Sequence, residues 1–212
     1  MKLDLAPVLN LLHSAHASTL ATQFTQMKGY PYATVVPNIL DEQHRPILLI
    51  SALAEHTKNL LADQKVSVSV TESGMLNVQD SQRLTIVGDA EQFEPCDLLK
   101  ARYLRYLPSA EQYLKLDFMF FRIQPKRMRY IGGVGRMGWI ENEVLEAVPS
   151  LSLADEGALL EEAIAIAPSN IDLLGFDAFG IDYLADGFRD RSAFQSKTFS
   201  REELLGMVTK LT

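Results

Sequence analysis

The sequence predicts an α+β protein, in which a small, mainly antiparallel β-barrel is followed by a small α+β unit. Before residue 140, five or six strand-like segments are separated by short turns and only a few helices, which is typical of such a barrel. The charge then changes. Residues 1–140 have a net charge of +2, whereas residues 141–190 carry 12 acidic groups and one basic group, Arg189. We therefore divide the chain into domains at residues 1–148 and 149–212.

Length and composition narrow the possible functions. The 212 residues, 47% of them hydrophobic, can build one core with a small appendage. A net charge of −7 argues against a nucleic-acid partner. The single cysteine, Cys96, excludes an intrachain disulfide and a cysteine-rich zinc site, so we expect a cytoplasmic protein. The uncharged runs fall short of the ~18 residues that a membrane helix needs. Polar residues near the start (Asp4, Asn10 and His13) argue against a signal peptide.

The chain begins with a helix, because apolar residues recur at helical spacing from Leu5 to Ala15. His13 and His16 lie three positions apart on it. With no third ligand nearby in the sequence, we interpret them as polar surface residues rather than metal ligands.

The barrel segments follow in order, each bounded by turn residues. Gly88 is expected at a β-bulge, Pro108 divides the second helical interval, and Pro125 bends the last strand or splits it into a pair. The predicted elements are strands at Thr19–Phe24, Tyr32–Leu40, Ile47–Ser51, Lys65–Thr71, Gln82–Phe93 and Phe118–Ile131, with helices at Glu55–Ala62 and Asp97–Leu116.

The segment Gly133-Val-Gly135-Arg-Met-Gly138 matches the GxGxxG pattern of dinucleotide-binding proteins. That reading needs a full helix and a second strand afterwards, and the chain reaches Pro149 too soon for either. We interpret these glycines as a tight turn instead.

The acidic unit has clear helix start signals. Ser152 is a predicted N-cap, and Ser200 with Glu203 forms a capping box. The unit is predicted to contain a helix at Leu153–Ala167, a hairpin of Ala178–Leu184 and Phe188–Phe194 over Ala185-Asp186-Gly187, and a last helix at Arg201–Leu211.

A candidate anion site lies where the strand Ile47–Ser51 leads into the helix Glu55–Ala62. The first turn of that helix carries His56, Thr57 and Lys58. Helix N-termini offer unpaired N–H groups and a partial positive charge, so a lysine and a threonine there could hold a phosphate. The alternative is an ordinary amphipathic helix that starts with polar residues.

The stretch from Phe118 to Ile140 carries basic residues and no acidic ones. It could bind an anionic ligand or pair with the acidic unit, and both interpretations stay open. The residues are Arg122, Lys126, Arg127, Arg129 and Arg136.

Several stretches in residues 9–140 resemble the FMN-binding split-barrel superfamily of pyridoxamine 5'-phosphate oxidase, and more closely its haem-utilisation (HugZ-like) branch. The most specific is the S-x-L-A-x-H-T-x-N-L core at Ser51–Leu60. Residues 152–211 resemble the small C-terminal domain often fused to this branch. The other matching stretches are LLHSAHASTLAT, YATVVPNIL, RLTIVGDAE, ARYLRYLPSAEQYLKLDFMFFRIQP, YIGGVGRMGWI, GFDAFGIDYL and FSREELLGMV.

The resemblance implies a homodimer with FMN bound in clefts at the subunit interface. Thr57 and Lys58 would hold the FMN phosphate, with Ser51 and His56 beside it. The residues implied at the flavin ring or the substrate are Thr34, Val35, Val36, Arg83, Arg136 and Trp139. No side chain stands out as an obligatory acid or base, so the catalytic residues are unknown and enzymatic activity stays open.

Three functions follow. The first is an FMN-binding flavoprotein, an oxidoreductase in which the flavin supplies the chemistry. The second is haem binding or degradation. The related C-terminal domain usually has an Asn-x-Asp-His pattern, but here Ile164, Ile166 and Ala167 occupy that place. The iron ligand would then have to be His13, His16, His44 or His56. The third is a non-catalytic binding or regulatory module on the same scaffold.

Overall fold

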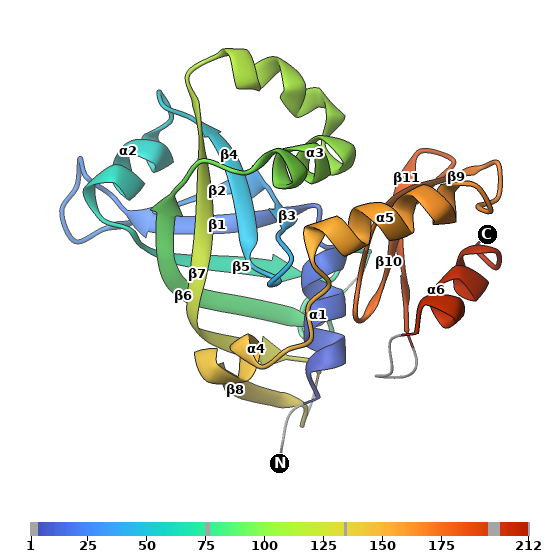
Figure 1. The fold of residues 1–212 in the computed structure, drawn as a ribbon. Helices are drawn as coiled ribbons and strands as arrows, with labels where there is room; N and C mark the ends of the chain where they lie inside the picture. Colours follow the sequence, from blue (N-terminus) through green and yellow to red (C-terminus); the bar gives the residue numbers. More distant parts are fainter. Residues whose placement is uncertain (1–3, 75–76, 134, 195–199, 212) are drawn as a thin grey trace.

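The computed structural model describes residues 4–74, 77–133, 135–194 and 200–211. It contains a curled antiparallel sheet with strand order β2-β1-β5-β6-β7-β4-β3, in which β8 also pairs with β7, and a separate sheet with order β11-β10-β9 (Figure 1). This confirms the predicted fold class of a split barrel followed by a small α+β region.

The elements of the barrel part are α1 (Leu5–Ser14), β1 (Ala17–Gln23), β2 (Pro31–Pro37), β3 (Ile39–Leu40), β4 (Pro46–Ser51), α2 (Glu55–Ala62), β5 (Lys65–Thr71), β6 (Arg83–Gln92), α3 (Asp97–Tyr106), the 3-10 helix η1 (Pro108–Lys115), β7 (Phe118–Ile131), β8 (Met137–Glu141) and α4 (Asn142–Glu146). Residues 149–211, which we call the C-terminal unit, contain α5 (Leu153–Ile164), β9 (Ile171–Asp177), β10 (Gly180–Ala185), β11 (Phe188–Ala193) and α6 (Arg201–Val208). The predicted domain boundary falls in the connection between α4 and α5.

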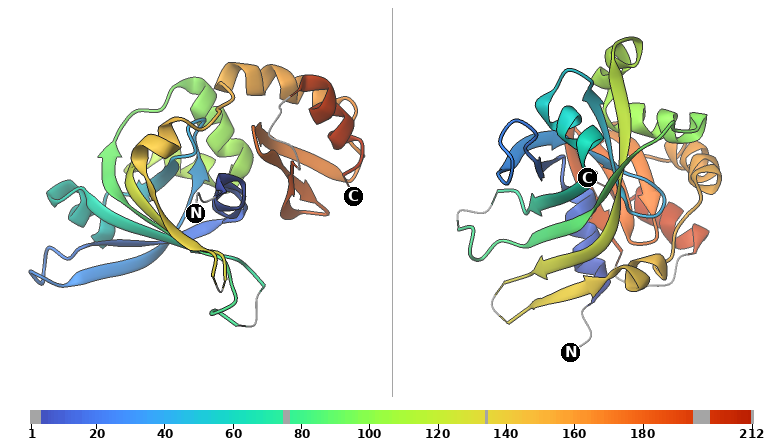
Figure 2. Two further views of the ribbon diagram at one scale, coloured as in Figure 1. Left: turned by 90° about the horizontal axis from the view of Figure 1, so that it is seen from below. Right: turned by 90° about the vertical axis from the view of Figure 1, so that its left-hand side faces the viewer.

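The curl of the barrel sheet depends on β7, which is one long strand. It pairs with the whole of β6, from Phe121 opposite Gln92 to Ile131 opposite Arg83. Its other edge is shared, because residues 118–122 pair with β4 and residues 127–131 pair with β8. The sheet therefore diverges along β7 and wraps into the half-barrel seen from below in Figure 2.

The predicted bulge at Gly88 is confirmed, since the register of β6 against β7 shifts between Val87 and Gly88. A Cβ atom on Gly88 would lie 2.1 Å from the backbone oxygen of Gln124. We expect Gly88→Ala to lower the free energy of unfolding by about 2 kcal/mol, because the backbone has to move. Urea unfolding measures this. Gly157→Ala is the control, since its Cβ would meet nothing within 4 Å on helix α5. Equal stability of the two variants would contradict the prediction.

Three hydrophobic clusters hold the chain together. The largest lies inside the curl, where α1 packs against the inner face of the barrel sheet. β4 is buried on both faces: Leu48 and Ile50 join the inner cluster, while Ile47 and Leu49 join a second cluster beneath α3 and η1. Leu174 of β9 belongs to that second cluster, so the C-terminal sheet packs on α3. A third cluster fills the C-terminal unit.

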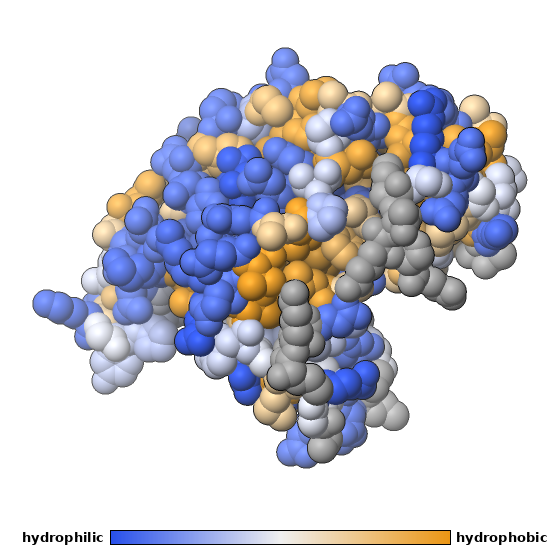
Figure 3. Space-filling view, turned by 60° about the horizontal axis from the view of Figure 1, so that its bottom comes forward, coloured by the Kyte–Doolittle hydropathy of each residue, from blue (hydrophilic) through white to orange (hydrophobic). Residues whose placement is uncertain are grey.

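The molecular surface is mixed in character. On the face in Figure 3, apolar side chains gather near the middle and hydrophilic side chains lie beside them. Among the described residues, no helix is both long and apolar enough to cross a membrane.

Several local predictions are confirmed. The Ser152 hydroxyl accepts a hydrogen bond from the N–H of Asp155, and the Ser200 hydroxyl accepts one from the N–H of Glu203, as the predicted N-caps should. β10 and β11 form the predicted hairpin, with Asp186 and Gly187 at positive φ in its turn. The glycine-rich segment is a turn between β7 and β8, in which the N–H of Gly132 donates to the carbonyl of Arg136 at 2.7 Å. Val134 lies outside the described residues.

Several predictions need correction. The strand β8 and the helix α4 were not predicted, and the predicted last helix Arg201–Leu211 ends earlier, at Val208. β9 was not predicted, because it is buried almost throughout and so lacks the alternation of a half-buried strand. The predicted strand Tyr32–Leu40 is interrupted at Asn38, which separates β2 from β3. The predicted helix Leu153–Ala167 ends earlier, at Ile164.

Candidate functional site

The outer face of the barrel sheet, opposite the core, presents a continuous row of side chains. Residues directly opposite one another in an antiparallel sheet share a face, so the register defines this row. Val35 is 69% exposed at one end and Trp139 is 47% exposed at the other. The full row is Val35, Thr19, Ser69, Thr85, Arg129 and Trp139.

Arginines gather around the tryptophan on this face. The guanidinium carbons of Arg127 and Arg129 lie 4.3 and 5.5 Å from the Trp139 ring centroid. Arg127 also pairs with Glu141 at 2.8 Å. Among the described residues, Arg83 and Arg129 form no ion pair within 4 Å, and Arg83 Nε is buried without a hydrogen-bond partner. This basic and aromatic strip can attract a planar anion by charge and by stacking.

The predicted anion seat at α2 is weaker than the sequence suggests. Lys58 is exposed, but its ammonium lies 3.9 Å from a carboxylate oxygen of Glu55 in the same turn. The Thr57 side chain is fully buried, and among the described residues its hydroxyl has no partner. A ligand on the surface can therefore reach Lys58 but not the Thr57 hydroxyl.

The other predicted residues beside this seat are accessible. His56 is half-buried, and burial lowers its pKa, which keeps the imidazole neutral at pH 7. Ser51 lies at the end of β4, where its hydroxyl accepts from the N–H of Leu53 at 3.2 Å. Their contact with a phosphate stays a prediction.

The structure separates the residues predicted for the flavin ring. Val35, Arg83 and Trp139 lie on the outer face. Val36 instead packs in the barrel core at 3% exposure, and Thr34 shares its side of β2. Arg136 is exposed in the turn between β7 and β8.

The basic stretch does not pair with the C-terminal unit among the described residues. Arg122 pairs with Asp41, Lys126 with Asp89 and Arg127 with Glu141. The buried carboxylates of the C-terminal unit bind other arginines: Glu156 binds Arg102 and Arg105, and Arg191 binds Asp177 and Asp182. The ligand alternative therefore remains for Arg129 and Arg136.

A buried polar cluster lies between α1 and the C-terminal sheet, and no local sequence pattern predicts it. His13, expected on the surface, is 2% exposed. Its Nδ1 lies 3.3 Å from Asp177 Oδ2 and 3.6 Å from Asp182 Oδ2, and its Nε2 lies 2.9 Å from His44 Nδ1. His16 is exposed, as expected.

This cluster has the residue types of a metal site but is already occupied by a cation. His13, Asp177 and Asp182 could each offer a ligand atom. However, Arg191 Nη2 lies 2.8 Å from Asp177 Oδ2, Arg191 Nη1 lies 2.7 Å from Asp182 Oδ1, and the Tyr106 hydroxyl donates to Asp182 at 2.7 Å. The guanidinium takes the place and the charge of a metal ion, so we do not assign a metal centre here.

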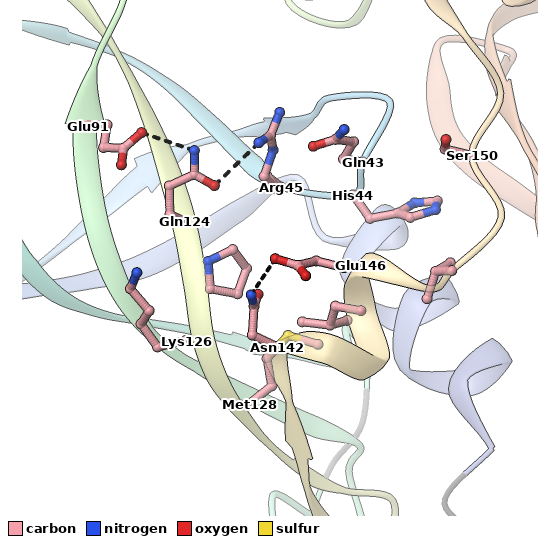
Figure 4. Close-up of a pocket in the computed structure, with 13 residues that line it drawn as sticks. Gln43, His44, Arg45, Glu91, Gln124, Lys126, Met128, Asn142, Glu146 and Ser150 are labelled. Carbon is pink, nitrogen blue, oxygen red and sulfur yellow. Dashed lines mark hydrogen bonds between the residues drawn. The ribbon is translucent and has the colours of Figure 1, made fainter.

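A pocket of about 420 Å³ lies between the β3–β4 turn, β7 and α4 (Figure 4). Its polar side chains are largely paired with one another. Gln124 accepts from Arg45 at 3.3 Å and donates to Glu91 at 3.0 Å, and Asn142 donates to Glu146 at 2.6 Å. His44 lies at the end of the pocket near Ser150. These mutual bonds leave the pocket less suited to an anion than the outer face.

Comparison with known proteins supports the split-barrel assignment. The family model described as Pyridoxamine 5'-phosphate oxidase matches residues 7–132. A relative from Arabidopsis thaliana, named "Non-canonical heme oxygenase HOZ, chloroplastic", is 33% identical over 129 residues, which cover 60% of this chain and 40% of the relative. The chain therefore spans less than half the length of that relative.

Two solved structures share the fold over almost the whole chain. A heme binding protein from Mycobacterium smegmatis is 24% identical with a TM-score of 0.63, over 99% of this chain and 98% of that one. The protein Atu2129 of unknown function from Agrobacterium tumefaciens is 23% identical with a TM-score of 0.74, over 95% of this chain and 94% of that one. These likenesses extend through the C-terminal unit and concern the fold alone.

Proposed function

Because the chain belongs to the pyridoxamine 5'-phosphate oxidase family, we propose that it binds a planar, conjugated, negatively charged cofactor on the outer face of its barrel sheet. The observation that carries this proposal is the exposed Trp139, which Arg127 and Arg129 flank on the same face that carries Arg83. An indole stacks on a conjugated ring system, and guanidinium groups bind phosphate or carboxylate in a fixed geometry.

We further propose that a second copy of the chain completes the site. α2, which carries Lys58 and His56, contacts β1 and β2, whereas Trp139 lies on β8 at the other side of the sheet. Four strand spacings separate β1 from β8, which come to about 19 Å. A symmetric dimer would bring the α2 turn of one copy towards the arginines of the other. It would also cover Val35, Val87 and Met137, which are 69%, 44% and 50% exposed.

FMN is the first cofactor with this chemistry. Lys58, with Ser51 and His56 beside it, would face the phosphate, while Trp139 and Val35 would cover the ring. The Nε of Arg83 is buried and has no hydrogen-bond partner among the described residues. A bound cofactor would supply the missing acceptor. A bound flavin supplies electron or hydride transfer, and the chain supplies position, charge and exclusion of water. The chain would then be an FMN-dependent oxidoreductase.

Haem is the second candidate, favoured by the name of the Arabidopsis relative. The two carboxylates of a haem would match Arg83 and Arg129, which form no ion pair in the described part of the chain. His13 and His44 bind each other inside the protein, so they are unsuitable iron ligands. His56, half-buried on α2, is the better candidate for the iron.

Absorption titrations of the purified protein with FMN and with haemin test the proposal, with the mass in solution recorded alongside. We expect Arg129→Ala to weaken binding of the true cofactor at least tenfold, by loss of a charge-assisted contact. Lys58→Ala should weaken FMN binding but leave haem binding unchanged, whereas His56→Ala should change the absorption spectrum of bound haem.

Lys126→Ala is the matched control. Lys126 is an exposed cation on β7, the strand that also carries Arg129, and its side chain lines the pocket of Figure 4. Sensitivity to Lys126→Ala with no effect of Arg129→Ala would move the site to that pocket. If the protein binds neither FMN nor haemin, the proposal is refuted. The split barrel would then be a scaffold for protein binding.

A further inference from the structure

Five buried side chains join the barrel to the C-terminal unit. We call this group the charged clasp: His13 on α1, His44 in the β3–β4 turn, Asp177 at the end of β9, Asp182 on β10 and Arg191 on β11. Besides its bonds to both aspartates, Arg191 donates to Asn10 of α1 at 2.8 Å. His44 Nε2 lies 3.3 Å from the carbonyl oxygen of Pro149, in the connection between α4 and α5. The clasp therefore contacts the barrel, the connection and the C-terminal sheet together.

The bonding partners define where the protons lie. The Pro149 carbonyl can only accept, so His44 Nε2 carries a hydrogen. A neutral His44 then has its lone pair on Nδ1, and His13 Nε2 must donate to it. His13 Nδ1 faces two carboxylates, which also only accept. His13 is therefore doubly protonated, and one imidazolium and one guanidinium balance two carboxylates.

Other charged groups border the clasp. Arg189 of β11 donates to the backbone oxygen of His13 at 2.7 Å and lies over the ring of Tyr106 on α3. Burial alone would raise the pKa of Asp177 and Asp182, but Arg191 and His13 outweigh it and hold both pKa values below the usual range. The aspartates therefore stay ionised under mildly acidic conditions.

His44 is held in place by the turn that carries it. Its backbone has φ of 61°, and Asp41 accepts from the N–H groups of Gln43 and Arg45 on either side. Phe179 packs against the His44 ring at 5.8 Å. His13, Asp177 and Arg191 are the charged groups that influence it from within the clasp. Arg45 and Glu146 line the same pocket, which gives protons a route to His44 (Figure 4).

We propose that the charged clasp is an acid-opened latch: uptake of a proton by His44 breaks the contact with His13 and releases the C-terminal unit from the barrel. A proton on His44 Nδ1 would point at the N–H of His13 only 2.9 Å away, and both rings would be cationic. Asp41 holds the backbone on both sides of His44, and Phe179 packs against its ring, so we expect the strain to fall on α1 and the connection at Pro149.

The pKa values agree with this order of events. Burial is the main cause that lowers the pKa of His44 to about 4, and the nearby charge of His13 adds to it. An unfolded histidine titrates near 6.5. Because the folded pKa lies below the unfolded one, the contribution of neutral His44 is complete above about pH 6.5 and is lost as the pH falls towards 4.

A distance measurement within one chain tests the latch. The native Cys96 is exposed at the start of α3, and Ala193→Cys adds an exposed site at the end of β11. Chains labelled at both positions with a fluorescence donor and acceptor are mixed with excess unlabelled protein, so that only distances within a chain contribute. We expect transfer efficiency to fall reversibly between pH 6.5 and 4. His44→Asn, which tolerates a positive φ and cannot be protonated, should remove that step.

Two results would overturn the proposal: an unchanged acid step in His44→Asn, or constant transfer efficiency in the parent protein. If His44→Asn does not fold, NMR titration of the double variant His16→Gln/His56→Gln decides. Only His13 and His44 then remain as histidines. The midpoint of the His44 signal should match the midpoint of the distance change, and a difference of more than about one pH unit rejects the latch.

Discussion

Replacing Arg191 by methionine is expected to lower the free energy of unfolding by about 3–5 kcal/mol, the usual cost of breaking a buried ion pair on one side. The Arg191 side chain is 3% exposed and pairs with two carboxylates, Asp177 and Asp182, whose side chains are 7% and 1% exposed. Methionine fills much of the volume but leaves Asp177 and Asp182 with a single cation, His13. Urea unfolding of the full chain measures the loss.

Two comparisons make this result specific. Arg201→Met removes an exposed arginine that pairs with Glu162 on the surface of the same unit, and should leave stability unchanged. Adding Asp182→Asn to Arg191→Met restores neutrality, because His13 then faces Asp177 alone, and should recover part of the loss. If the double variant is less stable than Arg191→Met, the charge balance assigned to the clasp is incorrect.

Glu156→Gln is the second change with a large expected effect. Glu156 is 2% exposed, binds Arg102 and Arg105 of α3 through one carboxylate oxygen, and accepts from the N–H of Phe176 at 3.2 Å. Glutamine has the same shape but no charge, so it leaves the buried Arg102 without its counter-ion. We expect a loss of about 3 kcal/mol in the free energy of unfolding.

Glu162→Gln is the matched control, since it makes the same change on the exposed side of the same helix, α5. Thermal or urea unfolding of both variants shows whether the loss of stability comes from the burial of the Glu156 charge or from the change of glutamate to glutamine itself. Similar losses in the two variants would show that Glu156 is not energetically distinct from a surface carboxylate.

Local sequence signals predicted much of the fold. The caps at Ser152 and Ser200 and the bulge at Gly88 depend on residues within a few positions, so they could be identified directly. β9 could not, because burial on both sides removes the period of two, and Gly175 weakens the strand pattern further. Gly175 is required there, since a Cβ would lie 2.5 Å from both Glu156 Oε1 and the Tyr106 hydroxyl.

The candidate site was less predictable for a related reason. The α2 turn can be read from neighbouring residues, but whether Thr57 faces solvent depends on how α2 packs on the barrel. Arg129 was identified as basic, yet its place beside Trp139 follows from strand register. His13 looked like a surface residue because its partners Asp177, Asp182 and His44 lie far away in the sequence.

The bonds between α1 and β11 have a consequence for biosynthesis. Arg189 contacts the His13 carbonyl across 176 positions of sequence, and Arg191 contacts Asn10 across 181. At about 5–20 residues per second, a ribosome needs roughly 10–35 s to add that length of chain. Most of this time is needed to make the barrel itself, whose elements end with α4 at Glu146. The last 45 residues before Arg191 take roughly 2–9 s, during which the barrel lacks the anionic partners of His13. The hydrophobic contacts of α1 must therefore hold the helix on the barrel until β11 emerges.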